Sequence, residues 1–293
     1  MAKNKRLITV TAGRLVYGVC YTQALASDEP RERAAKNKCS SAARQALNFK
    51  AGWKKLQLEL CANFTRNDLY ITLGFSDEHL PPNRREAKKL MQKFMDRLRQ
   101  RRRANGDDLK YVYAIHEQQD DGSRRIHFHL VINAGAARQD YELIRSLWEW
   151  GDNIEIDPIS ATPYYHNDDF LELAQYLLRE RNPDAPANAV GDRGWVPSRN
   201  LAKPVRESYM VEDNVTVTAP PGAIILDTDS RTNEYGSYAY INYLLPPPRK
   251  RQQRKKKKDT YFSDSGLCIS LGEGSEKMCT GTQKGVDGNG RSK

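Results

Sequence analysis

The segment RIHFHLVIN, residues 125–133, decides the fold that the sequence predicts. It is predicted to be a β-strand, and it carries His127 and His129 two positions apart. Side chains at i and i+2 of a strand project from the same face, so both imidazoles can reach one ion, while Phe128 points into the opposite layer. Because paired surface histidines are common and usually inert, the pair needs support from its surroundings.

The segment YVYAIHEQ, residues 111–118, is the predicted antiparallel partner of this strand. If the turn centres on residues 121 and 122, Glu117 lies opposite His127 and shares a face with both histidines. A register shifted by one residue points Glu117 elsewhere and favours His116. Two imidazoles and a carboxylate suit Mn²⁺ or Mg²⁺, with Zn²⁺ ranked below them, and the lack of a thiolate favours a catalytic ion over a structural one.

Around this hairpin, the order of elements predicts an α+β fold with a central antiparallel sheet flanked by helices. Residues 211–245 are strand-rich and are interpreted as an extension of that sheet. Helices are predicted over residues 30–62, 84–103, 141–150 and 170–181, and further strands over residues 69–75 and 154–159. The predicted organisation is an N-terminal strand and helical segment (1–62), a core (63–210), the strand-rich extension (211–245) and a disordered polybasic tail (246–293).

The positive charge of the chain is concentrated in two segments. Of the net +10, residues 84–103 contribute ten basic and two acidic side chains, and residues 249–258 contribute eight basic and no acidic ones. The rest of the chain is therefore mildly acidic. The first segment has an apolar stripe opposite its basic face, which indicates a docked helix that binds a nucleic-acid backbone. The expected DNA contacts are Arg84, Arg85, Lys88, Lys89, Lys93, Arg101, Arg102 and Arg103 of the helix and Lys255, Lys256, Lys257 and Lys258 of the tail.

Several classes of protein are excluded by what the sequence lacks. No stretch approaches the roughly 18 consecutive apolar residues of a membrane span, and no GxxxxGK[ST] loop of an ATPase occurs. The five cysteines are scattered and never spaced as CxxC, so they indicate reduced thiols of a cytoplasmic protein. The basic run at residues 249–258 is also typical of a nuclear-import signal, which stays open as an alternative.

Tyr176 is the candidate nucleophile. It lies in the predicted helix 170–181, outside the buried stripe, and shares a polar face with Glu172, Arg179 and Glu180. A free tyrosine, with a pKa of about 10, is a poor nucleophile, so a cation such as Arg179 would help its phenolate to form. Tyr164 and Tyr165, on the preceding loop, rank below Tyr176.

These motifs resemble the HUH endonucleases, in particular the rolling-circle replication initiator (Rep) proteins of bacterial plasmids, phages and integrated elements. Residues 71–75, 126–133 and 174–180 resemble the three motifs of that branch, in order. The resemblance implies a ferredoxin- or RRM-like endonuclease core with the histidine strand in its middle. It also implies metal-dependent nicking and rejoining of single-stranded DNA. His127, His129 and Glu117 would hold the ion, and Tyr176 would become linked to the 5′ end.

Arg179 stands where that family has a lysine, which keeps the charge but changes the geometry. The resemblance implies a single-stranded DNA origin as partner, with a hairpin expected, together with a host or separately encoded helicase and polymerase, and no membrane. Relaxases and single-strand transposases share this chemistry and stay open as alternatives. Rivals from other classes are a zinc-stabilised DNA-binding protein and a non-catalytic single-stranded nucleic-acid-binding module, in which Tyr111, Tyr113 and Phe128 would stack on bases.

Deletion of residues 249–293 is expected to weaken DNA affinity and to flatten its salt dependence. The deletion removes a run of eight cationic side chains, and cations that contact phosphates release counterions when they bind. Fluorescence anisotropy at several salt concentrations measures both effects, and nicking of the same DNA should persist. Loss of nicking would instead place this segment in the active site.

Overall fold

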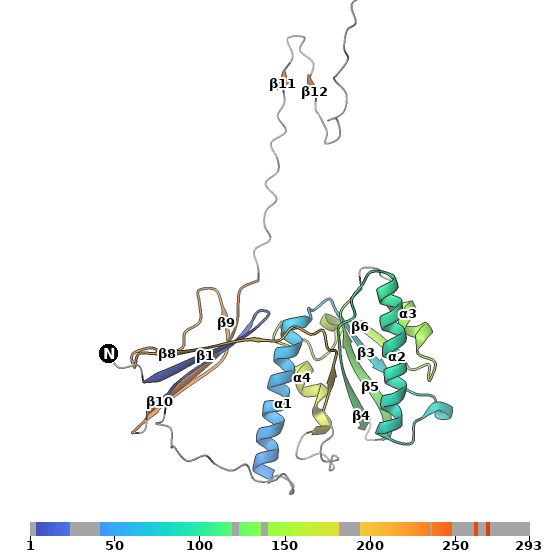
Figure 1. Cartoon of the computed structure of the whole chain (residues 1–293), viewed down its shortest axis with the longest axis horizontal. Helices are drawn as coiled ribbons and strands as arrows, with labels where there is room; N and C mark the ends of the chain where they lie inside the picture. Colours follow the sequence, from blue (N-terminus) through green and yellow to red (C-terminus); the bar gives the residue numbers. More distant parts are fainter. Residues whose placement is uncertain are drawn as a thin grey trace, which may run out of the picture. The chain divides into compact units, whose positions relative to one another are not determined.

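A computed structural model describes residues 4–23, 42–118, 123–135, 140–181, 194–234, 236–247, 261–262 and 268–269 (Figure 1). The fold is α+β, as predicted, with two antiparallel five-stranded sheets. The chain divides into one compact unit, Met1–Pro247, and a second, Pro248–Lys293. In the second unit, the described strands β11 (Tyr261–Phe262) and β12 (Cys268–Ile269) pair with each other. No helix among the described residues has the length and apolar character needed to cross a membrane.

The helices of the first unit follow the predicted segments. They are α1 (Ala42–Asn63), α2 (Arg84–Ala104), α3 (Asp140–Leu147) and α4 (Leu171–Leu177). Helix α2 begins where the Asn83 side chain accepts a hydrogen bond from the backbone N–H of Glu86, at 3.1 Å. Helix α4 is shorter than predicted, and a separate 3₁₀ turn, η3 (Arg179–Arg181), follows it. Residues 30–41 and the polybasic run with Lys255, Lys256, Lys257 and Lys258 lie outside the described residues.

The core sheet has the histidine strand at its centre. Its strand order is β6 (Ile154–Pro158), β3 (Leu69–Leu73), β5 (Arg124–Ile132), β4 (Tyr111–Gln118) and β7 (Val196–Pro197). Strand β5, which carries the two histidines, pairs antiparallel with β3 on one side and β4 on the other. The expected central antiparallel sheet is therefore confirmed.

The two-residue period of the strands divides the core sheet into two faces. Phe128, Leu130 and Ile132 of β5 pack in an apolar core with buried residues of α2 and α3. Val131, on the other face, packs in a second apolar core with residues of α1 and α4 (Figure 1). His127 and His129 share the face of Val131, so the prediction that Phe128 points into the opposite layer is confirmed.

The second sheet contains both the first and the last strands of the unit. Its order is β8 (Val205–Val211), β1 (Lys5–Ala12), β2 (Leu15–Thr22), β10 (Gly236–Leu244) and β9 (Ile224–Asn233). The expectation that residues 211–245 extend the core sheet is wrong, because β10 pairs with β2 and β9 with β10. The β1–β2 hairpin has two open edges, and β8 and β10 each satisfy the backbone groups of one.

The turn between β1 and β2 connects this sheet to the rest of the unit. Its first residue, Gly13, has a φ of 56°, and a Cβ there would lie 2.2 Å from the Cys61 carbonyl oxygen of α1. Its second residue, Arg14, donates to the Leu245 carbonyl at 2.7 Å and forms an ion pair with Asp168, in the loop before α4. The turn therefore fixes the second sheet against both α1 and that loop.

Gly13→Ala is expected to destabilise the fold by about 3 kcal/mol, roughly 1 for the left-handed backbone and roughly 2 for overpacking against α1. Gly106→Ala is the matched control, because Gly106 also has a positive φ, of 78°, but nothing within 4 Å of its Cβ position. It should cost only about 1 kcal/mol. Urea unfolding of both variants measures the difference, and equal losses would show that the turn does not press on α1.

Candidate active site

The register of the β4–β5 hairpin decides which side chains join the two histidines. His116 lies opposite His127, and Ala114 lies opposite His129. This register differs by one residue from the one that placed Glu117 beside the histidines, and an irregularity follows between His116 and Gln118. The structure therefore brings His116 onto the histidine face and turns Glu117 away from it.

His116, His127 and His129 form a buried cluster that could hold a metal ion. Their exposed fractions are 1%, 8% and 3%. One nitrogen of each ring lies within 4.8 Å of the other two, and the Nε2 atoms of His127 and His129 are 3.1 Å apart. Two nitrogens that bind one ion at about 2.1 Å lie roughly 3.0–3.4 Å from each other, so this spacing fits shared coordination.

The outward nitrogens of the rings are held by backbone and hydroxyl groups. His116 donates from Nε2 to the Leu177 carbonyl at 3.1 Å, and His127 donates from Nδ1 to the Arg125 carbonyl at 2.9 Å. Because a carbonyl only accepts, the inward nitrogens of the two neutral rings carry lone pairs. The inward Nδ1 of His116 is buried and has no hydrogen-bond partner. A buried acceptor in this position fits a metal ligand whose other nitrogen is oriented from outside.

The cluster is uncharged at neutral pH. Burial is the main cause, and it lowers the pKa of His116 to about 3 and the pKa of His129 well below its ordinary value. The charges of Arg179 and of the neighbouring imidazoles lower both pKa values further. Nδ1 of His129 lies 2.6 Å from the Tyr70 hydroxyl, which orients that ring. Sequence reasoning missed Tyr70, although its place two residues before Thr72 on β3 puts both polar side chains on the histidine face.

Tyr176 reaches the histidine cluster from α4. Its hydroxyl lies 3.4 Å from Nε2 of His129. The buried residues Leu173, Ala174 and Leu177 hold the opposite side of the helix in the second apolar core. The predicted division of this helix into a buried stripe and a face that carries Tyr176 is therefore what positions the hydroxyl.

Two neighbours fix the ring of Tyr176. The Tyr164 ring stacks on it, with centroids 3.7 Å apart and planes 21° apart. The Arg179 guanidinium carbon lies 4.5 Å from the ring centroid, and Arg179 also donates to the Gln118 carbonyl at 3.0 Å. Tyr165 differs from both, because its hydroxyl hydrogen-bonds to Asp168. The structure thus brings Tyr176, Arg179 and Tyr164 together beside the histidines.

Glu117 belongs to an ion-pair group at the end of β4. Arg84 contacts Glu117 at 3.1 Å and Glu180 at 3.5 Å. Glu180 also accepts hydrogen bonds from the backbone N–H groups of Glu117 and Gln118, at 2.5 and 2.8 Å. Arg84 was expected on the DNA-binding face, and the structure instead uses it to join α2 to β4 and η3.

The basic face of α2 lies on the other side of the core sheet from the histidines, because α2 packs on the Phe128 face (Figure 1). Arg102 is a correction to that face, since it is 1% exposed and pairs with Asp140 at 3.0 Å. It lies four residues after Leu98 of the apolar stripe, and this spacing turns its side chain inward. The other predicted contacts are Arg85, Lys89, Lys93, Arg101 and Arg103, which are exposed, and Lys88, which is half-buried.

A cleft of about 400 Å³ opens beside the cluster. Its volume lies within the range of small-ligand sites. The tyrosine hydroxyl and the ring nitrogens of the cluster lie along the same cleft, so a phosphodiester there would meet a nucleophile and a metal-binding site together. Further lining residues are Thr72, Arg125, Asn153, Glu155, Asp157, Tyr164 and Arg179.

Residues 68–178 match the sequence model of a family described as replication-associated protein, of the ORF2 type. The matched segment runs from β3 to the end of α4 and contains the three histidines and Tyr176. It leaves out the second sheet. No curated protein and no solved structure gives a significant match to the chain. The family match supports the resemblance to rolling-circle replication initiators.

His116→Ala is expected to weaken divalent-metal binding by at least about 100-fold, because it removes one of three nitrogen ligands. Glu117→Gln is the control, since it removes the neighbouring carboxylate that lies outside the cluster, and its metal affinity should stay unchanged. Calorimetric titration of the metal-free chain with Mn²⁺ and with Zn²⁺ measures both. A larger loss in Glu117→Gln than in His116→Ala would restore Glu117 as the third ligand.

Proposed function

We propose that this chain, which belongs through residues 68–178 to the ORF2-type family of replication-associated proteins, starts rolling-circle replication by nicking and rejoining single-stranded DNA at an origin. The intermediate would be a 5′-phosphotyrosine on Tyr176. One observation carries the proposal: the Tyr176 hydroxyl lies 3.4 Å from a ring nitrogen of His129, within a cluster suited to a divalent ion. A module that only binds DNA has no need of this juxtaposition.

His116, His127 and His129 would hold the ion, which when bound stabilises the negative charge on a phosphodiester oxygen as a Lewis acid. Imidazole nitrogens suit Zn²⁺ well, whereas Mg²⁺ prefers oxygen ligands and retains water. A set of three nitrogens therefore argues against Mg²⁺, and Mn²⁺ and Zn²⁺ are the ions to test. Glu155 and Asp157 line the same cleft and offer oxygen atoms nearby.

The proposed chemistry is a transesterification. The Tyr176 oxygen attacks the scissile phosphorus, the new O–P bond forms, and the bond from phosphorus to the 3′ oxygen breaks. The phenolic proton passes to solvent, and the departing 3′ oxygen takes up a proton from solvent. Attack by a 3′-hydroxyl on the phosphotyrosine reverses the step, restores the phosphodiester and releases Tyr176.

Arg179 would act on this step through its charge. Its guanidinium lies 4.5 Å from the Tyr176 ring centroid, where a cation stabilises a developing phenolate. Arginine stays protonated in proteins, so Arg179 cannot carry the proton that a lysine could. The stacked ring of Tyr164 restricts the rotation of Tyr176. The expected partners are the origin DNA and a separately encoded helicase and polymerase.

Tyr176→Phe is expected to abolish the covalent adduct while leaving DNA binding intact, because only the attacking oxygen is removed. Tyr164→Phe is the matched control, since it keeps the stacked ring in the same cleft and should still form the adduct. Labelled single-stranded oligonucleotides from the gene's own locus, incubated with Mn²⁺, with Zn²⁺ and with EDTA, give the adduct as a shifted band on a denaturing gel.

The outcomes separate the rival functions. An adduct that persists in Tyr176→Phe and disappears in Tyr164→Phe would move the nucleophile to Tyr164. Binding without cleavage under either metal, on DNA that spans the origin, would favour a non-catalytic single-strand-binding module. An adduct that forms in EDTA would contradict the role proposed for the histidine cluster.

A further inference from the structure

The second sheet carries a row of tyrosines on one face. Tyr17 and Tyr21 lie two pairs apart on β2, and Tyr238 and Tyr240 lie on the neighbouring strand β10. The register pairs Tyr238 with Tyr21 and Tyr240 with Val19, so all four tyrosines share one face. Adjacent aromatic side chains on the two middle strands of an antiparallel sheet form a surface on which bases can stack.

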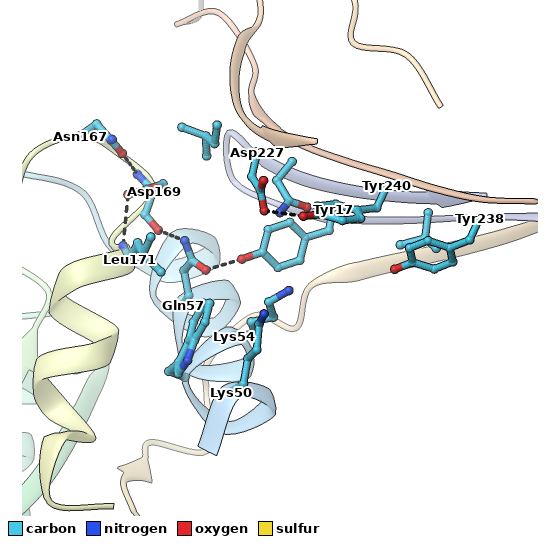
Figure 2. Close-up of a pocket in the computed structure, with 14 residues that line it drawn as sticks. Tyr17, Lys50, Lys54, Gln57, Asn167, Asp169, Leu171, Asp227, Tyr238 and Tyr240 are labelled. Carbon is cyan, nitrogen blue, oxygen red and sulfur yellow. Dashed lines mark hydrogen bonds between the residues drawn. The ribbon is translucent and has the colours of Figure 1, made fainter. Parts of the chain in front are cut away.

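A pocket of about 550 Å³ lies between this face, α1 and the loop before α4 (Figure 2). It is separate from the cleft at the histidines, and no residue lines both. Figure 2 shows Tyr17 pointing from β2 toward Gln57 of α1, with Lys50 and Lys54 on the same helix. The Tyr238 side chain, at the open end, is 44% exposed. The pocket is therefore accessible and has both aromatic and cationic walls.

The cations of the pocket are placed to meet an anion. Lys50 and Lys54 lie one helical turn apart, where like charges repel each other. The Lys54 ammonium lies 5.6 Å from the Tyr17 ring centroid and 5.8 Å from that of Trp53. Burial and the charge of Lys50 lower the pKa of Lys54. A phosphate between the two lysines would relieve the repulsion and compensate the burial of charge.

The polar groups of the pocket match the edges of a nucleobase. The Asp227 carboxylate, oriented by a hydrogen bond of 2.9 Å from the Tyr240 hydroxyl, can accept from an exocyclic amino group. Asn167 and Asn242 add amide groups that can both donate and accept. Flat aromatic walls, amide and carboxylate edges and a pair of lysines are together the groups that a nucleotide requires.

We propose that this pocket binds unpaired nucleotides of the same single-stranded DNA, outside the segment that is cleaved. The proposal rests on the proposed function for the identity of the strand. Bases within a duplex are already stacked and paired, so the tyrosine face can take only unpaired ones. The pocket would thus confine a second stretch of the strand while the first lies at Tyr176.

The protein connects this pocket directly to the helix that carries Tyr176. Gln57 contacts the Tyr17 hydroxyl and donates to the Asp169 carbonyl at 2.8 Å. Asp169 in turn accepts from the backbone N–H of Leu171, at 3.1 Å, which is the first residue of α4. A nucleotide that contacts Tyr17 and Gln57 therefore rests on the residues that fix the start of α4.

A crosslinking experiment on the wild-type chain tests the proposal first. The full chain in EDTA is mixed with a 30-nucleotide oligo(dT) that carries 5-iododeoxyuridine, irradiated and digested, and the crosslinked peptides are identified by mass spectrometry. Crosslinks at Tyr238, Tyr240 or Trp53 are expected. Crosslinks confined to the histidine cleft and α2 would overturn the proposal, and no variant is needed for this result.

Matched variants measure the contribution of the pocket. Tyr238→Ala should weaken binding of the same oligonucleotide by about 10-fold, and Lys50→Gln with Lys54→Gln should lower the salt slope by roughly 1.4. Tyr209→Ala and Lys55→Gln are the controls. Tyr209 is 54% exposed on the opposite face of the same sheet, and the Lys55 side chain is 70% exposed and contacts Glu59 and Trp195. Neither control should change affinity.

Equal losses in pocket and control variants, or no loss in either, would contradict a nucleotide site in this pocket. Because these measurements are made in EDTA, they do not depend on cleavage. Failure of the Tyr176 adduct with the pocket effects intact would overturn the proposed function and leave the pocket as a DNA site. A normal adduct without pocket effects would do the reverse.

Discussion

The pairing of His116 with His127 across the β4–β5 ladder is the contact on which the site depends. It places a third imidazole on the face that already carries His127 and His129. The opposite face of β5 is filled by a close-packed apolar core around Phe128, so the strand cannot rotate or slip without losing that core. Burial keeps the three rings neutral, and backbone carbonyls and the Tyr70 hydroxyl hold their outward nitrogens. The same register that packs the sheet therefore directs lone pairs to one point.

The core sheet also separates two roles in space. The histidines and Tyr176 lie on the side of α4, and the exposed cations of α2 lie on the side of Phe128. A strand bound at the cleft does not meet the basic helix on that face. The positively charged groups nearest the chemistry are instead Arg125 and Arg179, and the next group of cations on the histidine side is on α1. Net charge located a nucleic-acid partner correctly in kind but not the surface that faces the reaction.

The sequence was sufficient for features that depend on local periodicity. The alternation of β5, the apolar stripe of α2 and the inward face of α4 each follow from spacing, and each places its buried residues as predicted. Register was not predictable to the same degree, because a single extra residue near Gln118 exchanges Glu117 for His116 on the histidine face. Arg84 and Arg102 were misplaced for a related reason. Charge suggested exposure, whereas their partners Glu117, Glu180 and Asp140 are distant in sequence. The second sheet was missed because its strands are joined by long-range pairing.

That long-range pairing has a consequence for how the chain is made. Tyr21 pairs with Tyr238, so the tyrosine face cannot exist until almost the whole first unit has been synthesised. All strands of the core sheet except the short β7 lie between residues 69 and 158, and they are complete much earlier. During that interval the β1–β2 hairpin leaves the ribosome with both edges unpaired, a state prone to pairing with other chains. A truncated chain that ends before β10 can thus contain every histidine and Tyr176, yet lack the surface proposed to hold the strand. Completion of the second sheet makes full-length synthesis a condition for binding DNA at both places.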